Sequence, residues 1–325
     1  MSCPPSPATP AAPEMATGHH DPVTQRWLER IRDIRTWVRE GQRAPHKPLL
    51  LLWMLGRVQA GRTGPVTFAE LEEPVRGLLR DFGPPRASYH PEFPFHHLTS
   101  DGLWIITDAA GADARVLDTS VTRLRAAGAM GRLEPAFEEA LVADPDLLVT
   151  VAHTLLDANF PASLHDDLAA RTGLTLESDA PIPSAGSGRA RARRDPAFRS
   201  AVLVAYEYRC AMCGFDGWLA GEAVGLEAAH VRWWNIGGPN TVDNGLALCA
   251  LHHRLLDRGV LGLGDDGTVM VSQHFVGRTT SAQTQVLHLA GAPLLPPQTG
   301  TAPVAPHHRG WHTTQVFRGP ARAAA

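Results

Sequence analysis

The sequence predicts an α+β fold divided into two domains, and three observations support this prediction. Apolar residues recur every three or four positions through most of residues 21–175, where a short strand pattern also occurs. Residues 176–197 are rich in Pro, Ser and Gly and then in Arg, a composition typical of a linker. Beyond them, a Cys-x-x-Cys pair and a later Cys-x-x-His pair indicate a zinc-stabilised domain. The expected parts are a disordered tail over residues 1–20, a mainly helical domain with a short sheet over 21–175, a linker over 176–197 and a second domain over 198–320.

The composition is that of a soluble globular protein with room for two hydrophobic cores. The chain has 325 residues, of which 44% are hydrophobic and 19% are charged. Its formal net charge of −3 is not the signature of a nucleic-acid-binding protein, although binding depends on where the positive charges lie. We find no signal peptide and no apolar run long enough to cross a membrane, so no membrane partner is expected.

The cysteine count argues against a disulfide framework. Three of the four cysteines belong to the two pairs, and the fourth, Cys3, lies in the Pro- and Ala-rich tail, where no partner remains for it. Cysteines that stay reduced are typical of the cytosol, so a cytoplasmic protein is expected.

Two helices are expected at the start of the first domain. The first begins near Asp21 and carries an apolar stripe at helical spacings, formed by Trp27, Ile31, Ile34 and Val38. Gly41 is expected to end this helix. The second begins near Pro45 and reads PHKPLLLLWMLGRVQ. Because it is apolar all round, it is expected to be a central buried helix rather than a surface helix.

The remaining elements are predicted from shorter patterns. A third helix is expected over residues 68–82, and helices are expected again between residues 118 and 172. Residues 84–108 are rich in Pro and aromatic side chains, which predicts loops that close in a strand over residues 103–107. In the second domain, residues 198–209 predict a helix, and Asp265-Asp266-Gly267 predicts the turn of a hairpin.

Four side chains have the spacing of a structural zinc site. Two short chelating loops can place three thiolates and one imidazole at the corners of a tetrahedron, and the predicted ligands are Cys210, Cys213, Cys249 and His252. A Cys-x-x-Cys pair alone could also be two buried or redox-active cysteines. The later Cys-x-x-His pair favours zinc. The next residue, His253, points about 100° away from its neighbour on a helix, so it can serve a different site.

The same stretch resembles the HNH endonuclease family. The resemblance rests on three phrases, EAAH at residues 227–230, DNGLALC at 243–249 and HHRLLDRG at 252–259. It implies a ββα-metal fold in which His230 is the general base, Asn244 orients His230 or its loop, and His253 binds a catalytic divalent cation, Mg²⁺ or Mn²⁺. Without the resemblance, His230 could be an ordinary half-buried histidine and Asn244 a turn residue.

One position departs from the pattern of many HNH enzymes. These enzymes carry an acidic residue or a histidine as a second metal ligand just before the general base, whereas this chain has Ala229 there. The metal is therefore expected to have fewer protein ligands than usual. Glu227 is a weak candidate for the missing ligand.

The first domain resembles the sulfur-binding domain of phosphorothioation-dependent type IV restriction endonucleases. The phrases that carry the resemblance are APHKPLLLLWML at residues 44–55 and YHPEFPFHHLTSDGLW at 89–104. It implies binding of double-stranded DNA in which sulfur replaces a non-bridging phosphate oxygen. An apolar pocket for sulfur is expected from Tyr89, Pro91, Phe93 and Pro94. Flanking cations for the DNA backbone are expected from His46, Lys47, Arg86, His96 and His97.

Less specific interpretations remain for these residues. The aromatic side chains could belong to the core, and for Phe95 we favour that interpretation. Lys47 could be a solvated residue at a helix start.

Together the two resemblances predict a modification-dependent DNA endonuclease with a role in restriction. Double-strand cleavage normally requires two active sites, so a homodimer is considered. One alternative is an HNH endonuclease that reads 5-methylcytosine or hydroxymethylcytosine. Such readers usually enclose an extruded base. Another alternative is a DNA-binding protein that does not cleave.

Overall fold

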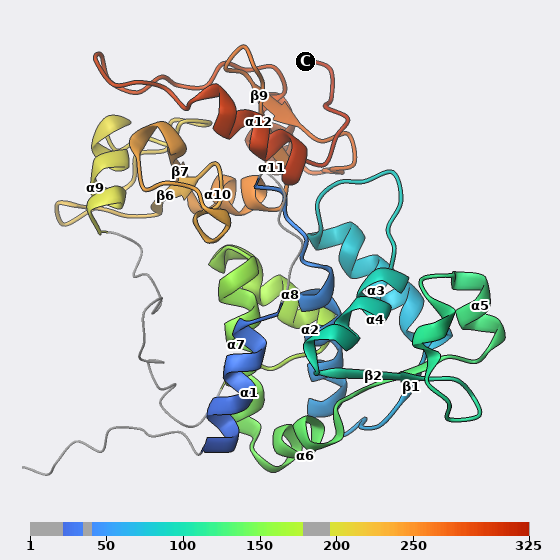
Figure 1. The fold of residues 1–325 in the computed structure, drawn as a ribbon. Coiled ribbons are helices and arrows are strands. Elements are labelled where there is room, and N and C mark those ends of the chain that lie inside the picture. The colour runs from blue at the N-terminus through green and yellow to red at the C-terminus, as the bar shows by residue number, and fades with distance from the viewer. Residues whose placement is uncertain (1–21, 35–40, 178–195, 325) are drawn as a thin grey trace, which may run out of the picture.

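A computed structural model describes residues 22–34, 41–177 and 196–324 (Figure 1). The first domain, blue to green in Figure 1, lies against the second domain, yellow to red. This is the predicted α+β architecture, with a mainly helical first domain and small two-stranded sheets in the second. Within the described residues, the helices are too short or too polar to cross a membrane.

The first domain is built from eight helices and one small sheet among its described residues. The helices are α1 (Pro22–Arg32), α2 (His46–Gln59), α3 (Phe68–Phe82), α4 (Glu92–His97), α5 (Val121–Ala126), α6 (Pro135–Ala143), α7 (Pro145–Asn159) and α8 (His165–Thr172). The strands β1 (Val66–Thr67), β2 (Trp104–Thr107) and β3 (Met130–Leu133) form an antiparallel sheet in the order β1-β3-β2. Short 3-10 turns η1 (Leu98–Asp101), η2 (Ala114–Leu117) and η3 (Ala162–Leu164) connect them.

Helix α2 is the centre of the first domain, as its apolar sequence predicts. Leu49 to Leu52 have no exposed surface, and α3, α4, α6, α7 and α8 all contact this helix. Burial of such side chains stabilises a fold by about 1.5–3 kcal/mol each. Helix α3 begins and ends at the predicted residues, and a capping box between Thr67 and Glu70 accounts for its start.

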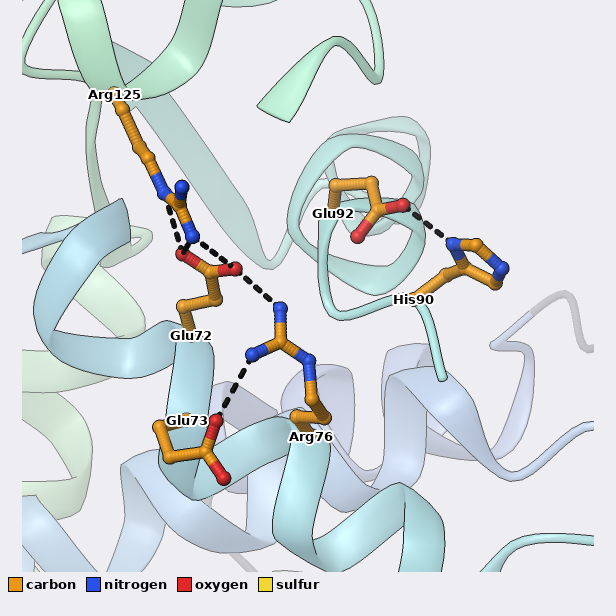
Figure 2. A network of polar contacts seen from close by, with 6 residues as sticks. All are labelled: Glu72, Glu73, Arg76, His90, Glu92 and Arg125. Atoms are coloured by element: carbon orange, nitrogen blue, oxygen red, sulfur yellow. Dashed lines mark hydrogen bonds and ion pairs between the residues drawn. The ribbon is translucent and has the colours of Figure 1, made fainter. Parts of the chain in front are cut away.

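Ion pairs to one buried carboxylate attach α5 to α3 (Figure 2). The carboxylate of Glu72 on α3 is 4% exposed and accepts hydrogen bonds from Arg125 Nε and Nη2, both at 2.8 Å. Arg76 contacts the same carboxylate and also Glu73. Because a buried carboxylate is costly without partners, these arginines fix the place of Glu72 and of the two helices.

Three local predictions for the first domain are wrong. Helix α1 ends at Arg32 rather than near Gly41, and Val38 lies outside the described residues. The proline-rich segment contains the helix α4. Its prolines are tolerated because Pro91 is the N-cap and Pro94 lies in the first turn, where a missing N–H costs little. Strand β3 interrupts the region expected to be helical.

The position of α4 is set by its buried face. Phe95 has no exposed surface and packs edge-on against Phe68 and Trp104, with ring centroids 5.1 and 5.9 Å away. Gly131 of β3 lies under these rings, and a Cβ atom there would come within 2.1 Å of the Trp104 ring. Phe95 is therefore a core residue, as expected, and the opposite face of α4 is left to face solvent.

The second domain contains the ββα unit that the HNH resemblance implies. Strands β6 (Leu226–His230) and β7 (Gly245–Cys249) pair antiparallel, with His230 opposite Gly245, and α10 (Ala250–Asp257) follows directly. The other elements are α9 (Pro196–Ala205), β4 (Trp218–Leu219), β5 (Glu222–Ala223), η4 (Trp234–Ile236), η5 (Val242–Asn244), β8 (Leu261–Leu263), β9 (Val269–Val271), α11 (Thr280–Gln285), η6 (Leu287–Leu289) and α12 (Pro306–Gln315). The pairing of β8 with β9 confirms the hairpin whose turn was predicted at Asp265-Asp266-Gly267.

The predicted tail and linker fall mostly outside the described residues. The tail over residues 1–20 is not described, and of the linker over 176–197 only the two ends are. Helix α9 begins at Pro196, just before the expected start of the second domain.

The two domains are joined by a buried interface around Arg43. This residue is 4% exposed, and its guanidinium lies 4.0 Å from the ring centroid of Trp233 in the second domain. Its backbone N–H and its Nη1 donate to Gln315 Oε1 and Gln315 O at 2.9 and 3.0 Å. Trp311 Nε1 donates to Gly41 O at 2.7 Å. Residues of α12 therefore pack on the core of the first domain.

Candidate functional sites

The four predicted zinc ligands come together in the second domain. One ligand atom from each of Cys210, Cys213, Cys249 and His252 lies within 4.8 Å of all the others. Hydrogen bonds from the neighbouring thiols lower the pKa of Cys210, which favours the thiolate that zinc requires. The set of three sulfurs and one imidazole fits a closed tetrahedral site.

A second contact determines which nitrogen of His252 faces the sulfurs. Its Nε2–H donates to Gln285 O at 2.8 Å, while Nδ1 lies 3.2 Å from Cys249 Sγ. A metal-binding histidine commonly donates its other ring N–H to such an oxygen. The carbonyl of Gln285, at the end of α11, is a contact that sequence spacing could not predict.

The two HNH histidines, His230 and His253, line a cleft of about 460 Å³ between the two domains. The second domain contributes His230 and Glu227 from β6 and His253 and Asp257 from α10. The first domain contributes the turn between α7 and α8, with Asp157, Phe160, Pro161, Ala162, Ser163 and His165. The cleft is therefore composed of both domains.

His230 is held in the cleft by a ring and an amide. Its imidazole stacks on Phe198 of α9, with centroids 4.0 Å apart and an interplanar angle of 18°. Its Nε2 lies 2.8 Å from Asn240 Oδ1. Because an amide oxygen can only accept, this contact places a proton on Nε2 and the basic lone pair on Nδ1. Asn240 was missed by the sequence analysis, since its local pattern is only that of a turn.

Asn244 is fully buried and holds the loop that follows His230. Its Oδ1 accepts from Arg232 N at 2.8 Å, and its Nδ2 donates to Arg232 O and Pro239 O, each at 3.0 Å. Of the two roles expected for this residue, these contacts correspond to orienting the loop rather than the imidazole.

His253 lies between two carboxylates. Its Nδ1 is 2.5 Å from Glu227 Oε2, and its Nε2 is 3.3 Å from Asp257 Oδ2. Burial disfavours the charged imidazole, but the carboxylates outweigh burial and raise the pKa of His253 to about 9. A cation that binds this histidine must therefore displace a proton.

The two carboxylates differ in their surroundings. The side chain of Glu227 is 39% exposed, whereas that of Asp257 is 2% exposed and lies behind the imidazole. Glu227 and His253 Nδ1 are the groups that could hold a divalent cation, and an imidazole with a carboxylate suits Mg²⁺ or Mn²⁺ completed by water and phosphate oxygens. Asp257 was missed by the sequence analysis, although its position four residues after His253 places both on one helix face.

The second hollow lies on the first domain and has a volume of about 870 Å³. Seven of the nine predicted DNA- or sulfur-binding residues line it, namely His46, Lys47, Arg86, Tyr89, Phe93, Pro94 and His97. The two others lie elsewhere. Pro91 is buried at the start of α4. His96 faces the segment that contains Arg115, and its Nε2 lies 3.2 Å from Arg115 O.

Phe93 is the exposed apolar side chain of this pocket. It is 40% exposed and stacks on His90 with centroids 4.8 Å apart. His90 in turn lies 2.7 Å from the buried carboxylate of Glu92 (Figure 2). Its Nε2 also lies 2.7 Å from Ser88 Oγ. His90, Ser88 and Arg43 also line the pocket and were not predicted.

The cations around the pocket are weaker than expected. Lys47 Nζ forms an ion pair with Asp101 at 2.6 Å, which offsets its charge. Burial lowers the pKa of His46 to about 4, so this residue is neutral near pH 7 in the protein without DNA. Burial also lowers the pKa of His97.

Family models match both domains. Residues 24–177 match the model described as ScoMcrA-like, DNA sulfur-binding domain, and residues 210–264 match the model described as HNH endonuclease. None of the curated proteins matches the chain.

Solved structures resemble the first part of the chain. The sulfur-binding domain of SprMcrA complexed with phosphorothioated DNA is 24% identical, covers 46% of this chain and 94% of its own, and has a TM-score of 0.40. The corresponding domain of ScoMcrA, also complexed with phosphorothioated DNA, is 22% identical, with 46% and 95% covered and a TM-score of 0.39. The type IV phosphorothioation-dependent restriction endonuclease ScoMcrA is 20% identical, with 45% of this chain and 32% of that chain covered and a TM-score of 0.38.

Proposed function

We propose that this chain, which joins a ScoMcrA-like DNA sulfur-binding domain to an HNH endonuclease domain, binds phosphorothioated double-stranded DNA and hydrolyses phosphodiester bonds near the mark. Its role would be the restriction of modified DNA in the cytoplasm. One observation carries the proposal: most of the residues predicted for sulfur binding line one hollow, and the two histidines predicted for hydrolysis, His230 and His253, line another hollow of the same molecule.

Sulfur recognition is assigned to Phe93 and Pro94. A phosphorothioate sulfur is larger, more polarisable and less strongly hydrated than oxygen, so apolar carbon contacts favour it. The exposed ring of Phe93 supplies such a surface, and the stack on His90 holds the ring in place. Arg86, which also lines the pocket, would contact a neighbouring phosphate.

Hydrolysis is assigned to His230 as general base. With its proton on Nε2 held by Asn240, the imidazole accepts a proton from water so that hydroxide attacks phosphorus in line with the leaving 3′ oxygen. Asn244 keeps the loop beside His230 in place. His253 and Glu227 would hold a divalent cation, which when bound polarises the phosphate and stabilises charge on the leaving oxygen.

A gel-shift at fixed salt tests the recognition step. Two duplexes of identical sequence are compared, one of which carries a single Rp phosphorothioate in each strand, and His230→Ala protein prevents cleavage. We expect tight binding to the sulfur duplex alone. Phe93→Ala should remove the preference, whereas Phe215→Ala, at a phenylalanine of similar exposure (44%) in the nuclease domain, should not.

Equal weak binding to both duplexes would exclude sulfur recognition and make the methylated-base alternative the next to test. Cleavage by the unaltered protein with Mg²⁺ or Mn²⁺ tests the second step. Sedimentation of the protein bound to the duplex then tests whether it is a homodimer, as expected if both strands are cut.

A further inference from the structure

We propose that Ser163 and Asp257 form a positioning relay through which the sulfur-binding domain orients His253 in the nuclease cleft. The inference rests on the proposed function, because it concerns the histidine assigned to the divalent cation. It assigns to the first domain a part in the nuclease site itself, in addition to DNA recognition.

The relay is a continuous chain of short contacts across the domain boundary. Ser163, in η3 of the first domain, donates from Oγ to Asp257 Oδ2 at 2.5 Å. The same carboxylate oxygen lies 3.3 Å from His253 Nε2. On the other side of the imidazole, Nδ1 faces Glu227 at 2.5 Å. All four side chains line the cleft.

Burial explains why Asp257 requires both partners. Its side chain is 2% exposed, and an ionised carboxylate in such a place is costly unless hydrogen bonds replace its water. The hydroxyl of Ser163 and the N–H of His253 supply these bonds. The carboxylate thereby becomes a fixed acceptor behind the imidazole.

A fixed acceptor behind His253 determines which nitrogen is available to a cation. A proton on Nε2, shared with Asp257, leaves the lone pair on Nδ1, which points toward Glu227 and the cleft. Partners of this kind orient a metal-binding histidine and increase its basicity, and losing one typically weakens metal affinity about 10–100-fold. Asp257 is thus a positioning residue for His253, and Ser163 is a positioning residue for Asp257.

The first domain presents Ser163 from a well-anchored turn. Leu164, next to it, is 2% exposed in the core of the first domain, and Leu164 N donates to Pro161 O at 2.9 Å. A second contact holds the two domains together nearby, since Arg254 of α10 donates to Asp167 of α8 at 2.5 Å. This ion pair touches neither Asp257 nor the imidazole, so it provides a matched control for the docking of the domains.

The test is Mn²⁺ binding to the zinc-loaded full chain, measured by electron paramagnetic resonance. Asp257→Asn should weaken binding about 10–100-fold, and Ser163→Ala should weaken it by roughly the lower end of that range. Ser163→Thr, which keeps the hydroxyl, should restore affinity, and Asp167→Asn should bind like the unaltered protein. In cleavage assays, Ser163→Ala should raise the Mn²⁺ concentration needed for half-maximal rate while leaving kcat at saturating Mn²⁺ and binding of the sulfur duplex unchanged.

Three results would overturn the relay. Unaltered affinity in both Ser163→Ala and Asp257→Asn would show that these contacts do not orient His253. An equal loss of Mn²⁺ affinity in Asp167→Asn would show that the effect comes from weaker contact between the domains and not from the orientation of His253. The third result is that His253→Ala does not remove Mn²⁺ binding from the protein. In that case His253 is not the cation ligand, and the relay is wrong together with the assigned cation site. Sulfur recognition is tested separately by the gel-shift. Thermal unfolding of each variant shows whether it is folded. If Asp257→Asn does not fold, Mn²⁺ binding by Ser163→Ala is the test of the relay.

Discussion

The sulfur pocket and the nuclease cleft hold their principal side chains in opposite ways. In the pocket, Phe93 is 40% exposed and is positioned by ring stacking, and the lysine of the lining, Lys47, is paired with Asp101. In the cleft, Asp257 is buried and His253 is enclosed by carboxylates, while the buried amide of Asn244 holds the loop that follows His230. The difference follows from the two tasks. Discrimination of sulfur from oxygen depends on apolar contact, whereas hydrolysis depends on charges fixed in advance of reaction.

The largest expected effect is that of zinc loss, which should remove cleavage while leaving sulfur recognition intact. Cys213→Ala removes one of four ligands, and structural zinc contributes about 10–16 kcal/mol to the folding of small zinc domains. We expect zinc loss and no cleavage, with preference for the sulfur duplex retained because all residues that line the pocket belong to the first domain. Zinc content and gel-shifts measure this, and a variant that keeps zinc and cleaves would contradict the assigned ligands.

Removal of the general base should abolish cleavage without affecting recognition. His230→Ala is expected to lower kcat about 10²–10⁴-fold, the usual contribution of general base catalysis. Asn240→Ala should cause a smaller loss, because the imidazole remains but its proton is no longer held on Nε2. Single-turnover cleavage measures both variants. Full activity of His230→Ala would place the base elsewhere in the cleft.

Acid should lower the stability of the nuclease domain through His312, which contacts the helix that carries His253. This residue of α12 is fully buried, its Nε2–H donates to Leu256 O of α10 at 3.0 Å, and burial lowers its pKa to about 4. Between pH 6.5 and 4 the imidazole of His312 is protonated in the unfolded chain but neutral in the folded protein. The contribution of the neutral, buried His312 to the free energy of unfolding is therefore complete above pH 6.5. It decreases as the pH falls, by about 1.4 kcal/mol per pH unit.

Urea unfolding at pH 7.5, 6.5 and 5.5 measures this contribution. His312→Gln should show a flatter dependence on pH than the unaltered protein. His46→Gln, which replaces the corresponding neutral histidine of the pocket wall, provides the comparison between the two sites. Identical slopes in His312→Gln and the unaltered protein would exclude His312 as the source.

The smallest expected effects concern the cations beside the pocket. Arg86→Ala should weaken binding of sulfur and oxygen duplexes by similar factors and reduce the salt dependence of binding by about one charge, because a phosphate contact does not distinguish the two. Lys47→Ala should change the salt dependence less, since Asp101 already offsets its charge. Gel-shifts over a salt series measure both. A selective loss of sulfur binding in Arg86→Ala would mean that this side chain contacts the sulfur itself.

Local patterns in the sequence were sufficient for several elements and for one site. Helix α3 occupies the predicted residues, α2 is the central buried helix, and the Cys/His spacing identified the four residues that cluster. Each of these depends on contacts between residues close in sequence or on short chelating loops. Local composition misled where tertiary packing decided, as in α4, whose helix forms in a proline-rich segment because Phe95 is buried against Phe68 and Trp104.

The recognition pocket was predicted in its residues but not in its charges. Phe93, Pro94 and five others line it as expected, and their roles in binding stay predictions. The neutral state of His46 and the pairing of Lys47 with Asp101, 54 residues away, depend on burial and on a distant segment. Composition and spacing contain no information on either.

By itself, the sequence determined the two-domain α+β architecture, the Cys and His residues of the zinc cluster, the two histidines of the cleft and the asparagine that holds the loop beside it. These follow from spacings and motifs within single segments. Only the tertiary structure decided that the cleft has a wall from the first domain and that Ser163 meets Asp257 across 94 residues of sequence. The physical reason is that a buried carboxylate obtains its hydrogen bonds from whatever donors packing places beside it, and those donors need not be near in the chain.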